Sequence, residues 1–130
     1  MSVNLMPSGH EAVHPHILVV QDEFFIRLML IEVLQEAGYF VIVACNADEA
    51  LTILSTRLPD LIITDVRMPG SCDGIEFMAK VRKANLDLPI IVTSGHFMPE
   101  AGQFTGHTHF LSKPYDYAAV IDLVDHELRH

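Results

Sequence analysis

Five polar residues, far apart in the sequence, are of types that could together carry out phosphoryl chemistry. Each lies at or just after the end of a short apolar run: Gln21, Asp22, Asp65, Thr93 and Lys113. Two carboxylates placed together would repel each other, and a hard cation such as Mg²⁺, which binds carboxylate, water and phosphate oxygens, would relieve that repulsion. A carboxylate can also attack phosphorus and form an aspartyl phosphate. A lysine, a hydroxyl group and a metal ion would then hold the phosphoryl oxygens.

These residues can meet only if the apolar runs form adjacent strands of one sheet. Strands are expected at residues 16–20, 40–44, 61–65, 89–94 and 109–112, and helices at residues 23–38, 47–57, 74–85 and 115–129. Runs that are apolar along their whole length indicate strands buried on both faces, and intervening helices indicate parallel strands joined by right-handed crossovers. The prediction is a doubly wound α/β domain, with a five-stranded parallel sheet and helices on both faces. In such a sheet the ligand site lies at the carboxyl ends of the strands.

Specific residues mark several helix ends. Asn46 is predicted to cap the second helix, with Glu49 at the position of a capping box, and Asp73 is predicted to cap the third. Gly38 is predicted to end the first helix. Between the fourth and fifth runs, residues 97–106 include a proline and two glycines, so a fourth helix there is expected to be short or irregular.

The composition favours some classes of protein for this chain and excludes others. A chain of 130 residues, of which 50% are hydrophobic, can form one domain with a core. Its net charge of -9 argues against non-specific nucleic-acid binding, and no apolar stretch reaches the ~18 residues of a membrane span. Its cysteines, Cys45 and Cys72, lack a paired spacing, which is typical of a cytoplasmic protein. Residues 1–14 do not resemble a signal peptide and are expected to be a flexible tail before a domain at residues 15–130.

The residues at the strand ends also match a known pattern. The stretches QDE (21–23), TDVRMPG (64–70) with DG (73–74), TSG (93–95) and KPY (113–115) occur in order, each at a strand end. With these motifs the chain, from about residue 15 to residue 130, resembles a response-regulator receiver domain of the chemotaxis-regulator type. The resemblance implies a flavodoxin-like sheet with strand order 2-1-3-4-5.

The same resemblance implies a role for each matching residue. Asp65 would accept a phosphoryl group from a histidine of a sensor histidine kinase or His-phosphotransfer protein. Asp22 and Asp65, with the backbone carbonyl of Arg67, would bind Mg²⁺. Thr93 would contact the phosphoryl group and reorient, and Lys113 would pair with it.

Three further positions are interpreted from the resemblance. Phe110 takes the place of the family's switch aromatic, and the Lys113–Pro114 peptide bond is expected to be cis. Gln21 departs from the family, which usually has an acidic residue there. It is expected to keep contact with the metal ion through a water molecule, with one negative charge fewer. The alternative is a degenerate receiver that no longer needs a metal ion.

The function hypothesis is a single-domain response regulator in two-component or phosphorelay signalling, because the chain ends directly after the last predicted helix. Such a domain phosphorylates itself on Asp65, is not otherwise an enzyme, and changes partner binding or relays phosphate. The alternative is a phosphorylation-independent protein-binding module with the same fold. A flavin carrier is a rival from another class, but QDEFF stands where its phosphate-binding loop would be needed. No nucleic acid or membrane partner is expected, and the chain is expected to be a monomer or weak homodimer.

Periodicity in the first helix predicts two apolar faces. At about 100° per residue, one broad stripe is expected to face the sheet: Ile26, Met29, Leu30, Val33 and Ala37. Phe24, Leu28 and Ile31 lie almost opposite and form a patch that begins close to Asp22. An aligned apolar patch usually marks a partner. Docking of the phosphate donor is favoured, and a homodimer contact and an unused patch are the alternatives.

Among the eight histidines, His107 and His109 would share one face of the fifth strand. The sequence places no third ligand beside them, so solvent-facing histidines are favoured over a zinc site. The final run DHELRH (125–130) is predicted to be a solvated helix end.

Overall fold

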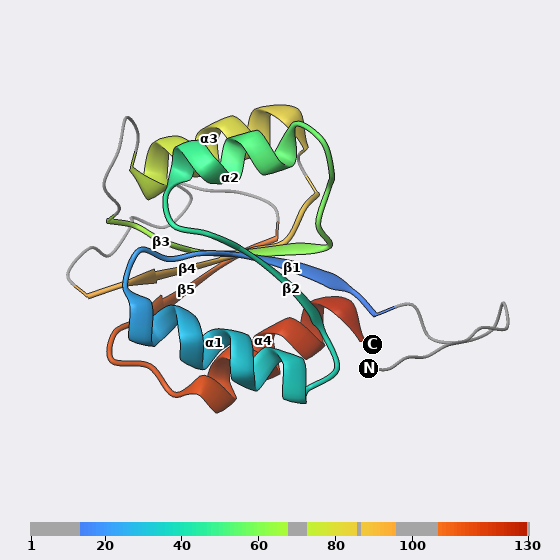
Figure 1. Cartoon of the computed structure of the whole chain (residues 1–130), viewed down its shortest axis with the longest axis vertical. Coiled ribbons are helices and arrows are strands. Elements are labelled where there is room, and N and C mark those ends of the chain that lie inside the picture. Colours follow the sequence, from blue (N-terminus) through green and yellow to red (C-terminus); the bar gives the residue numbers. More distant parts are fainter. Residues whose placement is uncertain (1–13, 68–72, 86, 96–106, 130) are drawn as a thin grey trace, which may run out of the picture.

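The computed structural model describes residues 14–67, 73–85, 87–95 and 107–129, which form an α/β domain of three layers (Figure 1). One sheet holds the strands β1 (His16–Val20), β2 (Phe40–Ala44), β3 (Leu61–Asp65), β4 (Ile90–Ser94) and β5 (Thr108–Ser112). Their order is β2-β1-β3-β4-β5, and each neighbouring pair is parallel. The predicted doubly wound sheet and its strand order are confirmed.

Helices cover both faces of this sheet. α2 (Ala47–Leu54) and α3 (Gly74–Ala84) lie on one face, and α1 (Phe24–Glu36) and α4 (Tyr117–Leu128) lie on the other (Figure 1). Neighbouring strand residues enter separate cores, because Leu18 packs with Phe77 of α3, whereas Ile17 packs with Leu30 of α1. This explains why β1, β2, β3 and β4 carry apolar residues at consecutive positions instead of at alternate ones.

The predicted N-caps of α2 and α3 are present, with one difference. Asp73 and Glu76 form a complete capping box at the start of α3. Asn46 accepts a hydrogen bond from the N–H of Glu49, as predicted. The Glu49 carboxylate, however, accepts from the N–H of Cys45, one residue before the cap, so this box is not the reciprocal one that was predicted.

The bounds of the other helices differ slightly from the prediction. Gly38 ends α1 as expected, with a φ of 97° that favours glycine. α4 begins two residues later than predicted, because the carboxylate of Asp116 accepts from the N–H of Ala118 and caps it there. Two predictions, the short or irregular helix at 97–106 and the flexible tail at 1–14 (His14 apart), lie outside the described residues. None of the helices in the described part of the chain is long and apolar enough to cross a membrane.

The faces of α1 correct the periodicity prediction. Leu30 and Leu34 are fully buried, although the predicted stripe omitted Leu34. Met29, predicted to face the sheet, is 40% exposed, and Ile31, predicted to lie on the outer face, is half-buried. The buried face of α1 is centred between Leu30 and Leu34, so it is rotated about the helix axis relative to the predicted stripe. This rotation turns Met29 outward and brings Ile31 partly inward.

Candidate functional site

Asp65 lies at the carboxyl end of the central strand β3 and is 6% exposed. Its Oδ2 atom accepts a hydrogen bond from Lys113 Nζ at 2.7 Å, and its Oδ1 atom accepts one from the N–H of Val66 at 2.9 Å. Thr93 on β4 is buried and is the register partner of Asp65. Three of the predicted site residues therefore come together at one edge of the sheet.

Gly74 holds the backbone of the Asp65 loop close to α3. Its N–H donates to the carbonyl oxygen of Val66 at 2.7 Å. A Cβ atom on Gly74 would lie 2.1 Å from the carbonyl oxygen of Asp65 and 2.7 Å from Cα of Val66. Only glycine allows this approach, so the DG pair of the sequence motif is explained by packing around the site.

Gln21 and Asp22 form the turn between β1 and α1. Gln21 is 2% exposed, and its Oε1 atom accepts a hydrogen bond from the N–H of Glu23 at 3.1 Å. Arg27 donates to the carbonyl oxygen of Gln21 at 3.0 Å. The Gln21 side chain therefore braces the turn that presents Asp22, and one lone pair of its Oε1 atom remains for a water molecule. Asp22 is exposed, and its carboxylate has no hydrogen-bond or ion-pair partner among the described residues.

The oxygen atoms at this edge have the chemistry of a magnesium site. The available ligands are the carboxylates of Asp22 and Asp65 and the backbone carbonyl of the exposed Arg67. Mg²⁺ prefers such hard oxygens, commonly one or two of them carboxylates, and keeps several water ligands. Each Asp65 oxygen has a lone pair left beside its bond to Lys113 or Val66. The described residues contain no cluster of three or more His, Cys, Asp or Glu side chains suited to a metal, so water would have to complete the shell.

Lys113 also lines an open cavity of about 500 Å³ between α1 and the loop that joins β5 to α4. The residues around this cavity include Ile26, Gly95, Lys113, Tyr115 and Tyr117. The Tyr115 hydroxyl is shielded from solvent and has no hydrogen-bond partner among the residues that the structure describes. The preceding Lys113–Pro114 bond is cis, as expected. Tyr115 is the third residue of the KPY motif, and nothing else in the sequence marks it.

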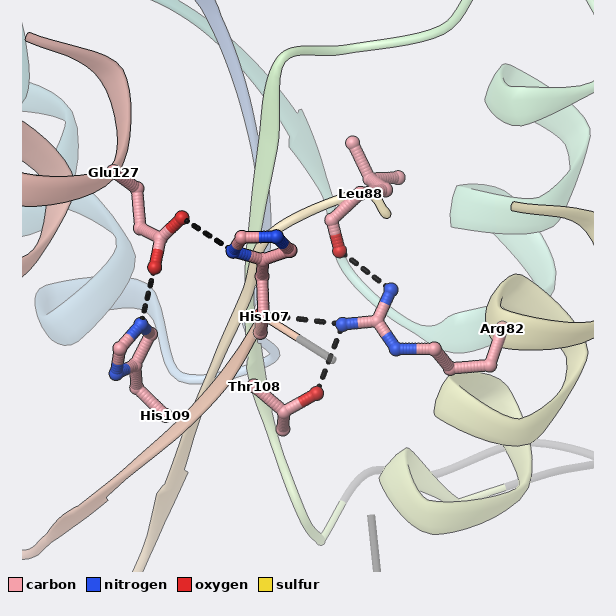
Figure 2. A network of polar contacts seen from close by, with 6 residues as sticks. All are labelled: Arg82, Leu88, His107, Thr108, His109 and Glu127. Atoms are coloured by element: carbon pink, nitrogen blue, oxygen red, sulfur yellow. Dashed lines mark hydrogen bonds and ion pairs between the residues drawn. The ribbon is translucent and has the colours of Figure 1, made fainter. Parts of the chain in front are cut away.

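A second polar cluster corrects part of the prediction of solvent-facing histidines and a solvated C-terminal helix end, because His107 is exposed as predicted but His109 is only 28% exposed and both contact Glu127. His107 Nδ1 and His109 Nε2 contact the two carboxylate oxygens of Glu127 in α4 at 3.1 and 2.6 Å (Figure 2). The Glu127 side chain is only 9% exposed. Burial alone would raise the pKa of Glu127, but the hydrogen bonds and charges of His109 and His107 outweigh burial and lower it. Glu127, which the sequence did not single out, thus links His107 and His109 at the start of β5 to α4.

Arg82 ties the same strand to α3 on the opposite face of the sheet (Figure 2). Its guanidinium group donates to the carbonyl oxygens of Leu88 and His107 and to Thr108 Oγ1. Both clusters lie at the start of β5, whereas Lys113 follows its end. They therefore stabilise the packing of the edge strand and take no part in the Asp65 site.

α1 exposes four large apolar side chains on its first two turns: Phe24 (58%), Phe25 (76%), Leu28 (48%) and Met29 (40%). We call these four residues the α1 surface. Phe24 and Leu28 were predicted to be exposed, whereas Phe25 and Met29 were not part of the predicted patch. Phe110, the expected switch aromatic, is half-buried and packs against the core under α2 and α3.

Comparisons of this chain with family models, with relatives and with solved structures all indicate the same protein family. The family model described as response regulator receiver domain matches residues 17–125. The chain is 32% identical over 112 residues to sporulation initiation phosphotransferase F of Bacillus subtilis (strain 168), which covers 83% of this chain and 89% of that protein. Other relatives are longer, and the chain spans 24% of the length of several of them.

Solved structures agree with this family. The chemotaxis protein CheY4 of Vibrio cholerae has a TM-score of 0.79 and 32% identity, covering 89% of this chain and 100% of that one. The response regulator TrrA of Thermotoga maritima, in complex with Mg²⁺-BeF, has a TM-score of 0.78 and 33% identity, covering 88% and 99%. With a match over most of its length and the same sheet, the chain belongs to the response regulator receiver domain family, the signalling domains of two-component and phosphorelay systems.

Proposed function

We propose that Asp65 is the phosphoacceptor of this receiver domain, and that the donor is a phosphohistidine of a sensor histidine kinase or His-phosphotransfer protein. The observation that carries the proposal is the 2.7 Å contact between Asp65 Oδ2 and Lys113 Nζ at the carboxyl end of the central strand. A carboxylate, a cation and the Thr93 strand end are already assembled there. A phosphorylation-independent binding module would need none of these groups.

Each residue has a defined part in the transfer. A carboxylate oxygen of Asp65 attacks phosphorus while the donor's N–P bond breaks, and the imidazole nitrogen leaves with the electron pair of that bond. Lys113 stays beside the new phosphoryl group and offsets part of its negative charge. The hydroxyl of Thr93, on the adjacent strand, reorients and donates a hydrogen bond to a phosphoryl oxygen.

The proposal includes a magnesium ion held by Asp22, Asp65 and the carbonyl oxygen of Arg67, with Gln21 contacting one of its water ligands. When bound, the ion would supply positive charge to the phosphoryl oxygens. The support is the carboxylate of Asp22, which has no partner among the described residues and follows the end of β1, and the carboxylate of Asp65 at the end of the neighbouring strand β3. The related TrrA structure, which contains Mg²⁺-BeF, adds support at the level of the family.

The donor protein docks on the α1 surface in this proposal. That surface begins at Phe24, directly after Asp22 and Glu23, so a protein bound there can bring its histidine to the site. The exposed carboxylates of Asp22, Glu23 and Glu32 favour a partner with an apolar ridge and basic side chains around it.

After phosphorylation, the domain changes partner binding or passes phosphate onward. The Bacillus relative is named a phosphotransferase, which favours the relay role. We place this exchange in the cytoplasm, because the exposed thiol of Cys45 is free and thiols persist in reducing compartments.

The decisive test is phosphate-affinity electrophoresis after incubation with acetyl phosphate, with and without Mg²⁺. The parent chain should give one shifted band that depends on Mg²⁺. Asp65→Asn keeps the shape of the side chain but removes the nucleophile, so the band should disappear. Asp122→Asn, an equal change at an exposed α4 residue, should label like the parent. Labelling of the Asp65→Asn chain would show that another residue is the acceptor.

A further inference from the structure

Tyr115 carries a hydroxyl group that is buried and has no hydrogen-bond partner in the described part of the chain. The hydroxyl of Tyr39, by contrast, donates to the carboxylate of Asp125. A hydroxyl in this condition costs free energy, because it has lost water and gained nothing in exchange. Such groups are rare in native proteins and call for an explanation, and one explanation is a partner that arrives only in another state of the molecule.

The surroundings of Tyr115 place this hydroxyl near the phosphorylation site. Burial raises the pKa of Tyr115, and the neighbouring groups Tyr117, Asp65 and Glu23 raise it further. The hydroxyl therefore keeps its proton at neutral pH and remains a donor. Its ring contacts that of Tyr117 edge-on, at 5.5 Å between centroids, and both rings line the cavity of about 500 Å³ beside Lys113.

In the unphosphorylated domain, no described residue accepts a hydrogen bond from the Tyr115 hydroxyl. The Asp65 carboxylate accepts hydrogen bonds from Lys113 and Val66 and makes none with Tyr115. A phosphoryl group on Asp65 would add three strong acceptor oxygens at this place. We propose that Tyr115 is a phosphoryl-binding residue, whose hydroxyl donates a hydrogen bond to a phosphoryl oxygen once Asp65 is modified. The proposal rests on the assignment of Asp65 as the phosphoacceptor.

The test compares Tyr115→Phe with Tyr117→Phe, which removes a hydroxyl from the neighbouring ring in the same cavity. Beryllium fluoride with saturating Mg²⁺ serves as a stable stand-in for the phosphoryl group, and calorimetric titration measures its affinity. Tyr115→Phe should bind beryllium fluoride about tenfold more weakly than the parent, as expected for a lost hydrogen bond to a charged acceptor. Tyr117→Phe should bind it like the parent.

A second measurement excludes a merely structural role for the hydroxyl. Without Mg²⁺ and beryllium fluoride, the urea midpoint of Tyr115→Phe should equal or exceed that of the parent, because no hydrogen bond is lost in this state. The chain has no tryptophan and three tyrosines, so tyrosine absorbance also reports on loading. The parent and Tyr117→Phe should share a spectral change that Tyr115→Phe lacks.

The outcomes separate this inference from the proposed function. Equal affinity of parent and Tyr115→Phe for beryllium fluoride overturns the role of Tyr115 and leaves Asp65 unaffected. A lower urea midpoint of the unloaded Tyr115→Phe chain overturns it as well, since the hydroxyl would then already have a partner. If acetyl phosphate does not label the parent and beryllium fluoride does not bind to it, the proposed function and the role of Tyr115 are both wrong.

Discussion

Lys113 Nζ and Asp65 Oδ2 lie 2.7 Å apart although 48 residues separate them in the chain. The sheet itself creates this contact, because the N–H of Lys113 donates to the carbonyl oxygen of Ser94 at 2.7 Å and so extends the ladder between β4 and β5. Both side chains are largely shielded from water, at 23% and 8% exposed. The Lys113 ammonium group therefore already lies beside Asp65, the proposed phosphoacceptor, in the unphosphorylated domain.

Removal of the Lys113 charge should slow phosphorylation strongly. Lys113→Ala should lower the rate of labelling by acetyl phosphate by about a hundredfold, the usual effect of losing one group that stabilises transition-state charge. Lys83→Ala, an equal change at an exposed residue of α3, is the matched control. Equal labelling rates for Lys113→Ala and Lys83→Ala would remove Lys113 from the site.

A restored acidic residue at position 21 should strengthen metal binding. Gln21→Glu adds a negative charge near Asp22 and should tighten Mg²⁺ binding by about 1 kcal/mol, roughly fivefold, with faster labelling at low Mg²⁺. A calorimetric Mg²⁺ titration measures the change. Gln35→Glu, on the exposed side of α1 away from the site, should leave the affinity as it is. The prediction fails if Gln21→Glu and the parent bind Mg²⁺ equally well.

A charge on the α1 surface should disturb the protein donor without affecting a small one. Leu28→Asp should slow phosphotransfer from a phosphohistidine protein at least tenfold, because it buries a carboxylate in an apolar contact. Labelling by acetyl phosphate should stay unchanged. Leu58→Asp, at a 64% exposed residue outside α1, is the control. Unchanged transfer by Leu28→Asp would refute docking there, and a change only in oligomeric state by light scattering would assign the surface to a dimer.

An added methyl group at Gly74 should destabilise the domain. Gly74→Ala places a Cβ atom 2.1 Å from the Asp65 carbonyl oxygen and should lower the free energy of unfolding by about 3 kcal/mol, since backbone must move. At Gly95, the nearest atom to such a Cβ is Lys113 Cβ at 4.0 Å, so Gly95→Ala should be tolerated. Urea unfolding of both variants decides the matter, and equal midpoints would contradict the packing argument.

The Glu127 cluster should make stability depend on acid pH. Because the pKa of Glu127 is lowered in the folded chain, its carboxylate contributes stability above the unfolded value of about 4.3 and loses it as pH falls through the lower folded value. Glu127→Gln should therefore cost about 1 kcal/mol at pH 7, with the difference from the parent fading below about pH 4. Glu36→Gln, at an exposed residue, is the control. A difference independent of pH would show that the charge of Glu127 does not matter.

Much of the fold and of the candidate site could be predicted from the sequence. Runs of consecutive apolar residues such as 61–63 identify buried parallel strands, and in a parallel sheet all carboxyl ends lie at one edge. Residues that end such runs must therefore meet, as Asp65, Thr93 and Lys113 do. The positions of these residues in space follow from their order in the chain, because every parallel strand ends at the same edge of the sheet.

Only the tertiary structure decided which way each helix turns and which side chains pair across layers. Periodicity indicated a buried face of α1, but the sheet beneath it selected Leu34 and turned Met29 outward. Similarly, no spacing in the sequence predicts that His109 contacts Glu127, or that the hydroxyl of Tyr115 has no partner among the described residues. These relationships depend on how helices are rotated and seated on the sheet. The rotation and position of each helix are decided by the packing of side chains that are distant in sequence, so a local sequence pattern cannot predict them.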